Sequence, residues 1–188
     1  MNTAAQGSNI RQYKIITGNY WAFTLTDGAL RMLVVLHFHA LGYAPLEIAL
    51  LFVFYEFFGV VTNLVGGWLG ARLGLNQTMN IGLGLQILAL MMLAVPASML
   101  TVPWVMLAQA LSGIAKDLNK MSAKSAIKLF VPEGVDRKLY GWVALLTGSK
   151  NTLKGVGFFL GGGWLTTQDF RNALLLMAGI LMLVLICS

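Results

Sequence analysis

The amino-acid sequence predicts an all-α integral membrane protein with six transmembrane helices. Of its 188 residues, 57% are hydrophobic and only 11% are charged, whereas a soluble domain carries about 25% charged residues. The mean hydropathy is +0.75, and apolar segments of roughly twenty residues, long enough to cross a bilayer, recur along the chain. The 21 glycines and 10 methionines are typical of closely packed membrane helices.

Prolines and polar breaks set the limits of the six segments. We expect a cytoplasmic N-terminal segment, residues 1–16, followed by a six-helix transmembrane bundle over residues 17–188. The first helix follows the polar start, Pro45 opens the second, and Pro96 closes the third. Pro103 lies in the first turn of the fourth helix, where proline is tolerated. The fifth helix follows a polar loop, and the sixth reaches the C-terminus. The approximate ranges are 17–40, 46–70, 77–95, 103–128, 139–165 and 172–188.

The purely apolar part of the fourth helix is too short to cross the bilayer by itself. Residues 103–115 span about 20 Å at 1.5 Å per residue, less than the roughly 30 Å hydrocarbon core. To cross the bilayer, this helix must include Lys116 and Lys120. Loop charges support the crossing: with a cytoplasmic N-terminus, the outer loops hold Arg171 as their one basic residue, as the positive-inside bias predicts. The inner basic residues are Arg11, Lys14, Arg72, Lys128, Arg137 and Lys138.

Charged residues from four helices are expected near the middle of the bilayer. Counted from the expected helix ends at 1.5 Å per residue, they lie about 12–24 Å deep. A base that faces lipid at such depth costs roughly 2.5–3.5 kcal/mol, so we expect an internal hydrated cavity. Five bases against three acids leave positive charge that an anionic ligand would balance. The bases are Arg31, Lys116, Lys120, Lys150 and Lys154, and the acids are Asp27, Glu56 and Asp117.

Some of these charges can be explained without a ligand, by ion pairs within one helix or by a position near the membrane surface. Asp27 and Arg31 are four residues apart and could form an ion pair along one helix, and Asp117 could pair with Lys120 or Lys124 in the same way. Lys124 and Lys128 lie close enough to the inner helix end to extend their amino groups to the surface.

Two lysines of the fifth helix are better explained by a role in binding an anionic ligand. Lys150 and Lys154 repeat the four-residue spacing with no acid nearby in the sequence. Asn119 and Asn151 each adjoin a deep lysine and are candidate ligand contacts, although such residues more often form interhelical hydrogen bonds.

Other classes of function find little support in the sequence. The one cysteine, Cys187, excludes an internal disulfide, and no motif typical of nucleotide binding, a metalloprotease or a nucleophilic enzyme occurs. We therefore expect no enzyme, no cofactor and no metal site. The net charge of +6 does not indicate nucleic-acid binding, because much of it lies inside apolar segments.

Six helices joined by short loops, with the N-terminus inside, resemble one half of a transporter of the major facilitator superfamily. The loop between the second and third helices is similar to the family signature Gly-x-x-x-Asp-Arg-x-Gly. Gly67, Arg72 and Gly74 match this cytoplasmic loop motif, while Ala71 stands where the family has its acid.

Three segments resemble the organoarsenical efflux transporters of bacterial arsenic-resistance operons. They are YWAFTLTDGALRMLVVLHF at 20–38, FYEFFG at 54–59 and AKDLNKMSAKS at 115–125. The resemblance covers essentially the whole chain and the N-terminal half of that family. It implies export of 1-arseno-3-phosphoglycerate, which gives arsenate resistance. It also implies a functional link to glyceraldehyde-3-phosphate dehydrogenase, which makes this compound from arsenate in place of phosphate.

Together these observations predict a multi-pass carrier in the bacterial inner membrane that moves a multiply charged anion by alternating access. The deep bases would bind the anion, and the deep acids would hold the lysines in place when the site is empty or carry a coupling proton. Two alternatives remain: an exporter or exchanger of another organophosphate or phosphonate, and a non-transporting scaffold that binds anionic lipid headgroups. Since facilitators place their site between two six-helix halves, we expect a missing C-terminal half or a second copy of this chain as partner.

Overall fold

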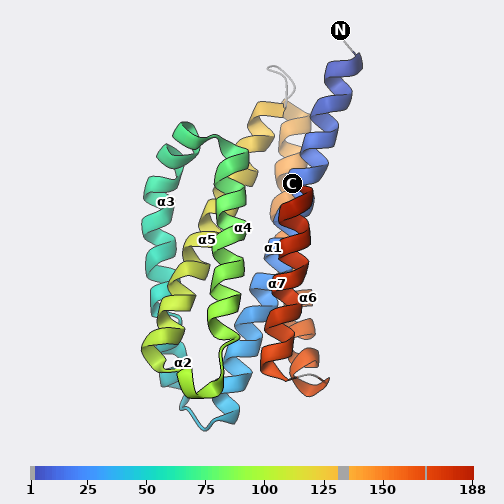
Figure 1. Ribbon diagram of the computed structural model, residues 1–188. Helices are drawn as coiled ribbons and strands as arrows, with labels where there is room; N and C mark the ends of the chain where they lie inside the picture. The colour runs from blue at the N-terminus through green and yellow to red at the C-terminus, as the bar shows by residue number, and fades with distance from the viewer. Residues whose placement is uncertain (1–2, 131–135, 168) are drawn as a thin grey trace.

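The computed structural model describes the backbone of residues 3–130, 136–167 and 169–188 (Figure 1). Side chains are described except at residues 1–11, 13, 127–140, 142 and 166–168. The side chains of Arg11, Lys128, Arg137 and Lys138, which the sequence places on the inner side, lie outside this part.

The described residues form helices and contain no strand. The crossings are α1 (Thr3–Ala40), α2 with α3 (Pro45–Leu51 and Val53–Leu73), α4 (Leu75–Leu93), α5 (Val102–Phe130), α6 (Asp136–Thr167) and α7 (Phe170–Cys187), with a short 3-10 helix, η1 (Ala97–Met99), between α4 and α5. α2 and α3 together make one crossing, interrupted at Phe52 alone. The predicted all-α fold with six crossings is therefore confirmed.

Two boundaries differ from those that the sequence predicts. The first helix begins at Thr3 rather than Thr17, because the polar residues 3–16 continue the helix instead of ending it. The second helix breaks at Phe52, whose N–H bonds to the Ala49 carbonyl in a tighter turn. The other four ranges agree within about three residues, the usual uncertainty of helix ends.

The helices run alternately up and down (Figure 1). α3, α4 and α5 lie together on one side of the bundle, with α1, α6 and α7 on the other. α1 packs along α6, α5 packs along both α3 and α4, and α4 packs against α7. The hydrophobic core lies between these groups and includes Leu30, Leu33, Leu83, Leu90 and Leu174.

Glycines allow the helices that carry the charges to approach closely. A Cβ atom added to Gly28 of α1 would lie 2.9 Å from the Lys154 carbonyl oxygen of α6, and one added to Gly113 of α5 would overlap the Tyr55 backbone of α3. Small residues permit such backbone contact between membrane helices. These two contacts bring α6 against α1, and α3 against α5, at the level of the charged residues.

The outer faces of α3 and α7 are apolar. Exposed side chains include Phe57 and Leu64 on α3 and Leu183 and Ile186 on α7. On length and composition alone, two described segments are apolar enough to cross a membrane, Pro45–Leu73 and Phe170–Cys187. The remaining crossings carry the charged and amide side chains that lower their hydropathy and that form the polar interior of the bundle.

Candidate functional site

Four lysines from two helices surround one small cavity. Lys116 and Lys120 reach it from α5, and Lys150 and Lys154 reach it from α6. The α1 side chains Asp27, Tyr20, Phe23 and Thr24 complete its wall. The cavity has a volume of about 20 Å³, enough for a water molecule but not for a phosphate group. The structure thus brings together the four lysines that the sequence places at one depth.

Asp27 is the buried acid beside this cavity. Its Oδ1 accepts a hydrogen bond from the Tyr55 hydroxyl at 2.6 Å, and its Oδ2 lies 3.6 Å from Lys154 Nζ. Among the described residues, Arg31 forms its ion pair with Glu56 rather than with Asp27. The helical pair Asp27–Arg31, considered from the sequence, is therefore replaced by two pairs between helices.

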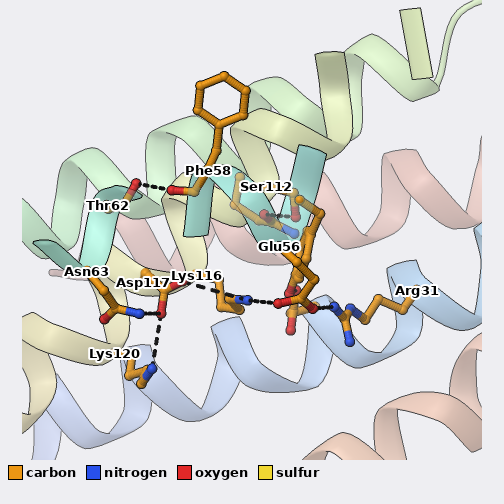
Figure 2. Close-up of polar contacts among 12 residues, drawn as sticks. Arg31, Glu56, Phe58, Thr62, Asn63, Ser112, Lys116, Asp117 and Lys120 are labelled. Atoms are coloured by element: carbon orange, nitrogen blue, oxygen red, sulfur yellow. Dashed lines mark hydrogen bonds and ion pairs between the residues drawn. The ribbon is translucent and has the colours of Figure 1, made fainter. Parts of the chain in front are cut away.

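Glu56, near the start of α3, bridges two cations from different helices. Its Oε1 pairs with the Arg31 guanidinium of α1, and its Oε2 lies 3.4 Å from Lys116 Nζ of α5 (Figure 2). Both cations also lie over the Tyr55 ring, with Arg31 Cζ and Lys116 Nζ each 4.1 Å from the ring centroid. The ring attracts cations at this distance, so Tyr55 and Glu56 hold the same two side chains.

Asp117 links the lysines of α5 to α3. Its Oδ1 accepts hydrogen bonds from Lys120 Nζ and from Asn63 Nδ2, each at 3.1 Å, and its Oδ2 lies 3.7 Å from Lys116 Nζ (Figure 2). A Cβ atom at Gly59 would lie 2.6 Å from Oδ2, so a glycine at this position leaves space for the carboxylate.

Lys150 differs from the other deep bases. Within the described part of the chain, no carboxylate lies within 4 Å of its amino group, whereas at least one does at each of the other four bases, Arg31, Lys116, Lys120 and Lys154. Its amino group instead experiences the like charges of neighbouring lysines. Lys150 therefore carries one of the two excess positive charges, and the other is spread over the bases that share Glu56 and Asp117.

The two asparagines do not line the lysine cavity. Asn119 is fully buried against α4, where its Nδ2 donates to the Met79 carbonyl at 3.4 Å, and Asn151 is exposed on α6. Successive residues of a helix point about 100° apart, so a position next to a deep lysine directs the side chain elsewhere. Their predicted ligand contacts have no support in this geometry.

Tyr55 and Asn63 belong to the cluster but are not among the residues predicted from the sequence. Tyr55 is fully buried and touches both cations and Asp27. A helical projection of α3 would have pointed to it, because Tyr55, Gly59, Thr62 and Gly66 repeat at three- and four-residue spacing and form one buried stripe.

The predicted loop motif spans the last turns of α3 and the break before α4, with Gly67 and Arg72 inside α3 and Gly74 between the two helices. Gly74 has φ +85° and ends α3, with its N–H donating to the Gly70 carbonyl; this left-handed conformation favours glycine. The Arg72 guanidinium lies 4.7 Å from the centre of the Trp68 ring. Gly67 lines a separate cavity of about 390 Å³ between α3 and α5.

A larger cavity lies beside Arg31. It measures about 420 Å³ and is lined by Met32, Val35, Phe52 and Phe158 as well as Arg31 itself. Among the described residues, no group of three or more His, Cys, Asp or Glu side chains is placed to hold a metal ion. The chemistry available to the site is therefore the binding of negative charge by amino and guanidinium groups.

Comparison with known proteins identifies the family. Residues 16–188 match the model of the Major Facilitator Superfamily, and a search of the curated proteins found no match. The matched region contains α1 from residue 16 onward, all of α2 to α7 and every charged residue of the cluster. The chain therefore belongs to the major facilitator superfamily, a family of multi-pass membrane transporters.

Proposed function

We propose that this protein exports a small organic anion with several negative charges by alternating access. The observation that carries the proposal is the cavity that Lys116, Lys120, Lys150 and Lys154 share. Lysines bind phosphate-like groups as point charges, and arginine can bind them through two parallel hydrogen bonds. Ionisable residues inside a membrane bundle are expensive to bury and mark substrate or ion pathways.

The substrate that we propose is 1-arseno-3-phosphoglycerate, on the resemblance to organoarsenical efflux transporters. Its phosphate and arsenate ends would supply the negative charge that Lys150, which lacks a carboxylate neighbour among the described residues, requires. We place the protein in the bacterial inner membrane with a cytoplasmic N-terminus, in keeping with the basic residues of the expected inner loops.

The arrangement favours a transporter over a lipid-binding scaffold. A scaffold for anionic headgroups would direct its lysines towards lipid near the membrane surface. Here Lys116, Lys120 and Lys154 form ion pairs with acids of the bundle, and all four lysines border one cavity. Since that cavity is too small for a phosphate group, transport requires α6 or α5 to move relative to α1, as alternating access implies.

Uptake into inverted membrane vesicles tests the class of substrate. We expect concentrative uptake of labelled 3-phosphoglycerate, a stable relative of the proposed substrate, with competition by organophosphates but not by glycerol. Lys150→Gln is expected to reduce uptake about tenfold or more, the effect of one charge-assisted hydrogen bond. Lys14→Gln, at an exposed lysine near the N-terminus, is the matched control. Uptake that is equal in both variants and in the wild type would contradict the proposal.

Arsenate resistance tests the specific substrate. Cells that express both this protein and glyceraldehyde-3-phosphate dehydrogenase are expected to tolerate arsenate better than cells that express either alone. If the dehydrogenase has no effect on resistance while 3-phosphoglycerate uptake persists, the organoarsenical is excluded. Another organophosphate or phosphonate then becomes the substrate.

A further inference from the structure

We propose that Glu56 is a displaceable internal anion that competes with the substrate for Arg31 and Lys116. These two cations on the face of Tyr55 would form a distinct oxyanion subsite, suited to a phosphoryl, arsono or carboxylate group. This proposal rests on the proposed function, because it assigns a second subsite to the same anionic ligand. Three features of the cluster support it: exposure, the other contacts of the two cations, and the adjoining space.

Exposure separates Glu56 from the other acids. Its side chain is 60% exposed, while the side chains of Asp27 and Asp117 are 2% and 3% exposed. Each buried acid also accepts a hydrogen bond from a neutral neighbour, Tyr55 or Asn63. Within the described residues, the partners of the Glu56 side chain are two cations. Its departure therefore leaves no neutral buried donor without an acceptor.

The two cations keep other contacts when Glu56 leaves. Lys116 retains Asp117 and the Tyr55 ring, and Arg31 retains the same ring together with the Phe52 ring, 5.8 Å from its Cζ. The hydrogen bond from the Tyr55 hydroxyl to Asp27 fixes the ring that both cations contact. The positive charges therefore stay in position for an incoming oxyanion, which lowers the reorganisation that binding requires.

Space is available beside this subsite. Arg31 borders the cavity of about 420 Å³, whereas the lysine cavity measures about 20 Å³. Lys116 belongs both to the proposed subsite, where it pairs with Glu56, and to the wall of the lysine cavity. An anion can thus meet Arg31 and Lys116 before the lysine cavity opens, and a ligand with two anionic ends can then span both subsites.

Binding of 3-phosphoglycerate and of inorganic phosphate to the purified protein, measured by isothermal titration calorimetry, tests the proposal. Glu56→Gln keeps the size of the side chain and removes the competing charge, so it should bind 3-phosphoglycerate up to about fivefold tighter, the upper range of an exposed ion pair. Asp117→Asn is the matched control, and it should bind more weakly, because its acid positions two lysines. Equal or weaker binding by Glu56→Gln would overturn the proposal.

A double-mutant cycle assigns any gain to this subsite. Adding Arg31→Gln to Glu56→Gln should abolish the gain, and a gain that persists would reflect long-range charge and also overturn the proposal. If the wild type binds 3-phosphoglycerate and Glu56→Gln binds it equally well, Glu56 does not compete with the ligand, but the proposed function stands. Absence of anion binding in the wild type and in Glu56→Gln rejects the proposed function itself. Thermal unfolding of each variant confirms that the proteins compared are folded.

Discussion

Asp27 joins two parts of the charged cluster that come from different helices. One carboxylate oxygen accepts a hydrogen bond from the Tyr55 hydroxyl of α3, and the other forms an ion pair with Lys154 of α6. Its side chain is 2% exposed, so these two partners satisfy most of its charge. This single carboxylate therefore fixes the ring on which Arg31 and Lys116 lie and also holds one wall of the lysine cavity.

Replacing Asp27 with asparagine should destabilise the protein. The variant leaves Lys154 without its carboxylate and weakens the hydrogen bond from Tyr55, and we expect a loss of about 2–4 kcal/mol in the free energy of unfolding. Chemical denaturation in detergent measures it. The matched control is Asp169→Asn at the exposed start of α7, where the side chain makes no capping hydrogen bond. Equal stability of the two variants would show that Asp27 has no structural part in the cluster.

At the scale of the element, the contact between α1 and α6 depends on Gly157. A Cβ atom there would overlap the Leu25 carbonyl oxygen and lie 3.0 Å from the Ala29 nitrogen, both backbone atoms of α1. Gly155, two residues earlier on the same helix, has nothing within 4 Å of such an atom. The two glycines thus offer identical chemistry in opposite surroundings.

Alanine substitutions at these glycines should change stability in opposite directions. Gly157→Ala forces the two backbones apart, and we expect a loss of about 1–3 kcal/mol in the free energy of unfolding. Gly155→Ala meets no obstacle and gains helix propensity, up to about 1 kcal/mol. Thermal unfolding of both variants and the wild type in the same detergent measures these changes in stability. A similar midpoint for both would mean that α1 and α6 are free to separate.

The sequence predicted the crossings well, because the limits of a membrane helix follow from proline, glycine and hydropathy. It also brought the four lysines together correctly, because depth along a straight helix is simple arithmetic. The helical pair Asp117–Lys120 that the sequence allowed does form. The partner of Asp27 could not be assigned from the sequence, because the packing of α1 on α6 decides that it pairs with Lys154 rather than with Arg31 on its own helix. Tyr55 was missed because its contacts are with residues of other helices, although its place on the buried stripe of α3 could have pointed to it.

At the scale of the whole molecule, the polar cluster lies within a bundle whose outer faces are apolar. Arg31, Glu56, Lys116 and Lys154 come from α1, α3, α5 and α6, while α4 and α7 contribute none of the deep charges. Facilitators place their site at the interface of two six-helix halves. We therefore propose that a second six-helix unit, from a C-terminal half or from another copy of this chain, completes the chamber around these four helices.

Access of water to the chamber can be measured by cysteine labelling, because Cys187 is the one cysteine of the chain and is easily replaced. In a Cys187→Ser background, we expect Lys150→Cys to react with a charged, water-soluble thiol reagent. Phe159→Cys should not react, although the native side chain is 85% exposed, because an apolar surface in the membrane meets lipid or a partner rather than water. Exposure in the isolated chain and exposure to water are thus different quantities, and the pair of variants separates them.

Protection by an anion completes this test. The Lys150→Cys variant keeps Lys116, Lys120 and Lys154 around the cavity, so 3-phosphoglycerate should still bind, about tenfold more weakly, and at a concentration raised to match should slow the labelling. Glycerol, which carries no charge, should leave the labelling rate unchanged. A reaction as fast at Phe159→Cys as at Lys150→Cys, or none at Lys150→Cys from either side of the membrane, would contradict a hydrated chamber. The lysines would then have to be held by the acids of the bundle alone, and the positive charge at Lys150 would have no ligand to balance it.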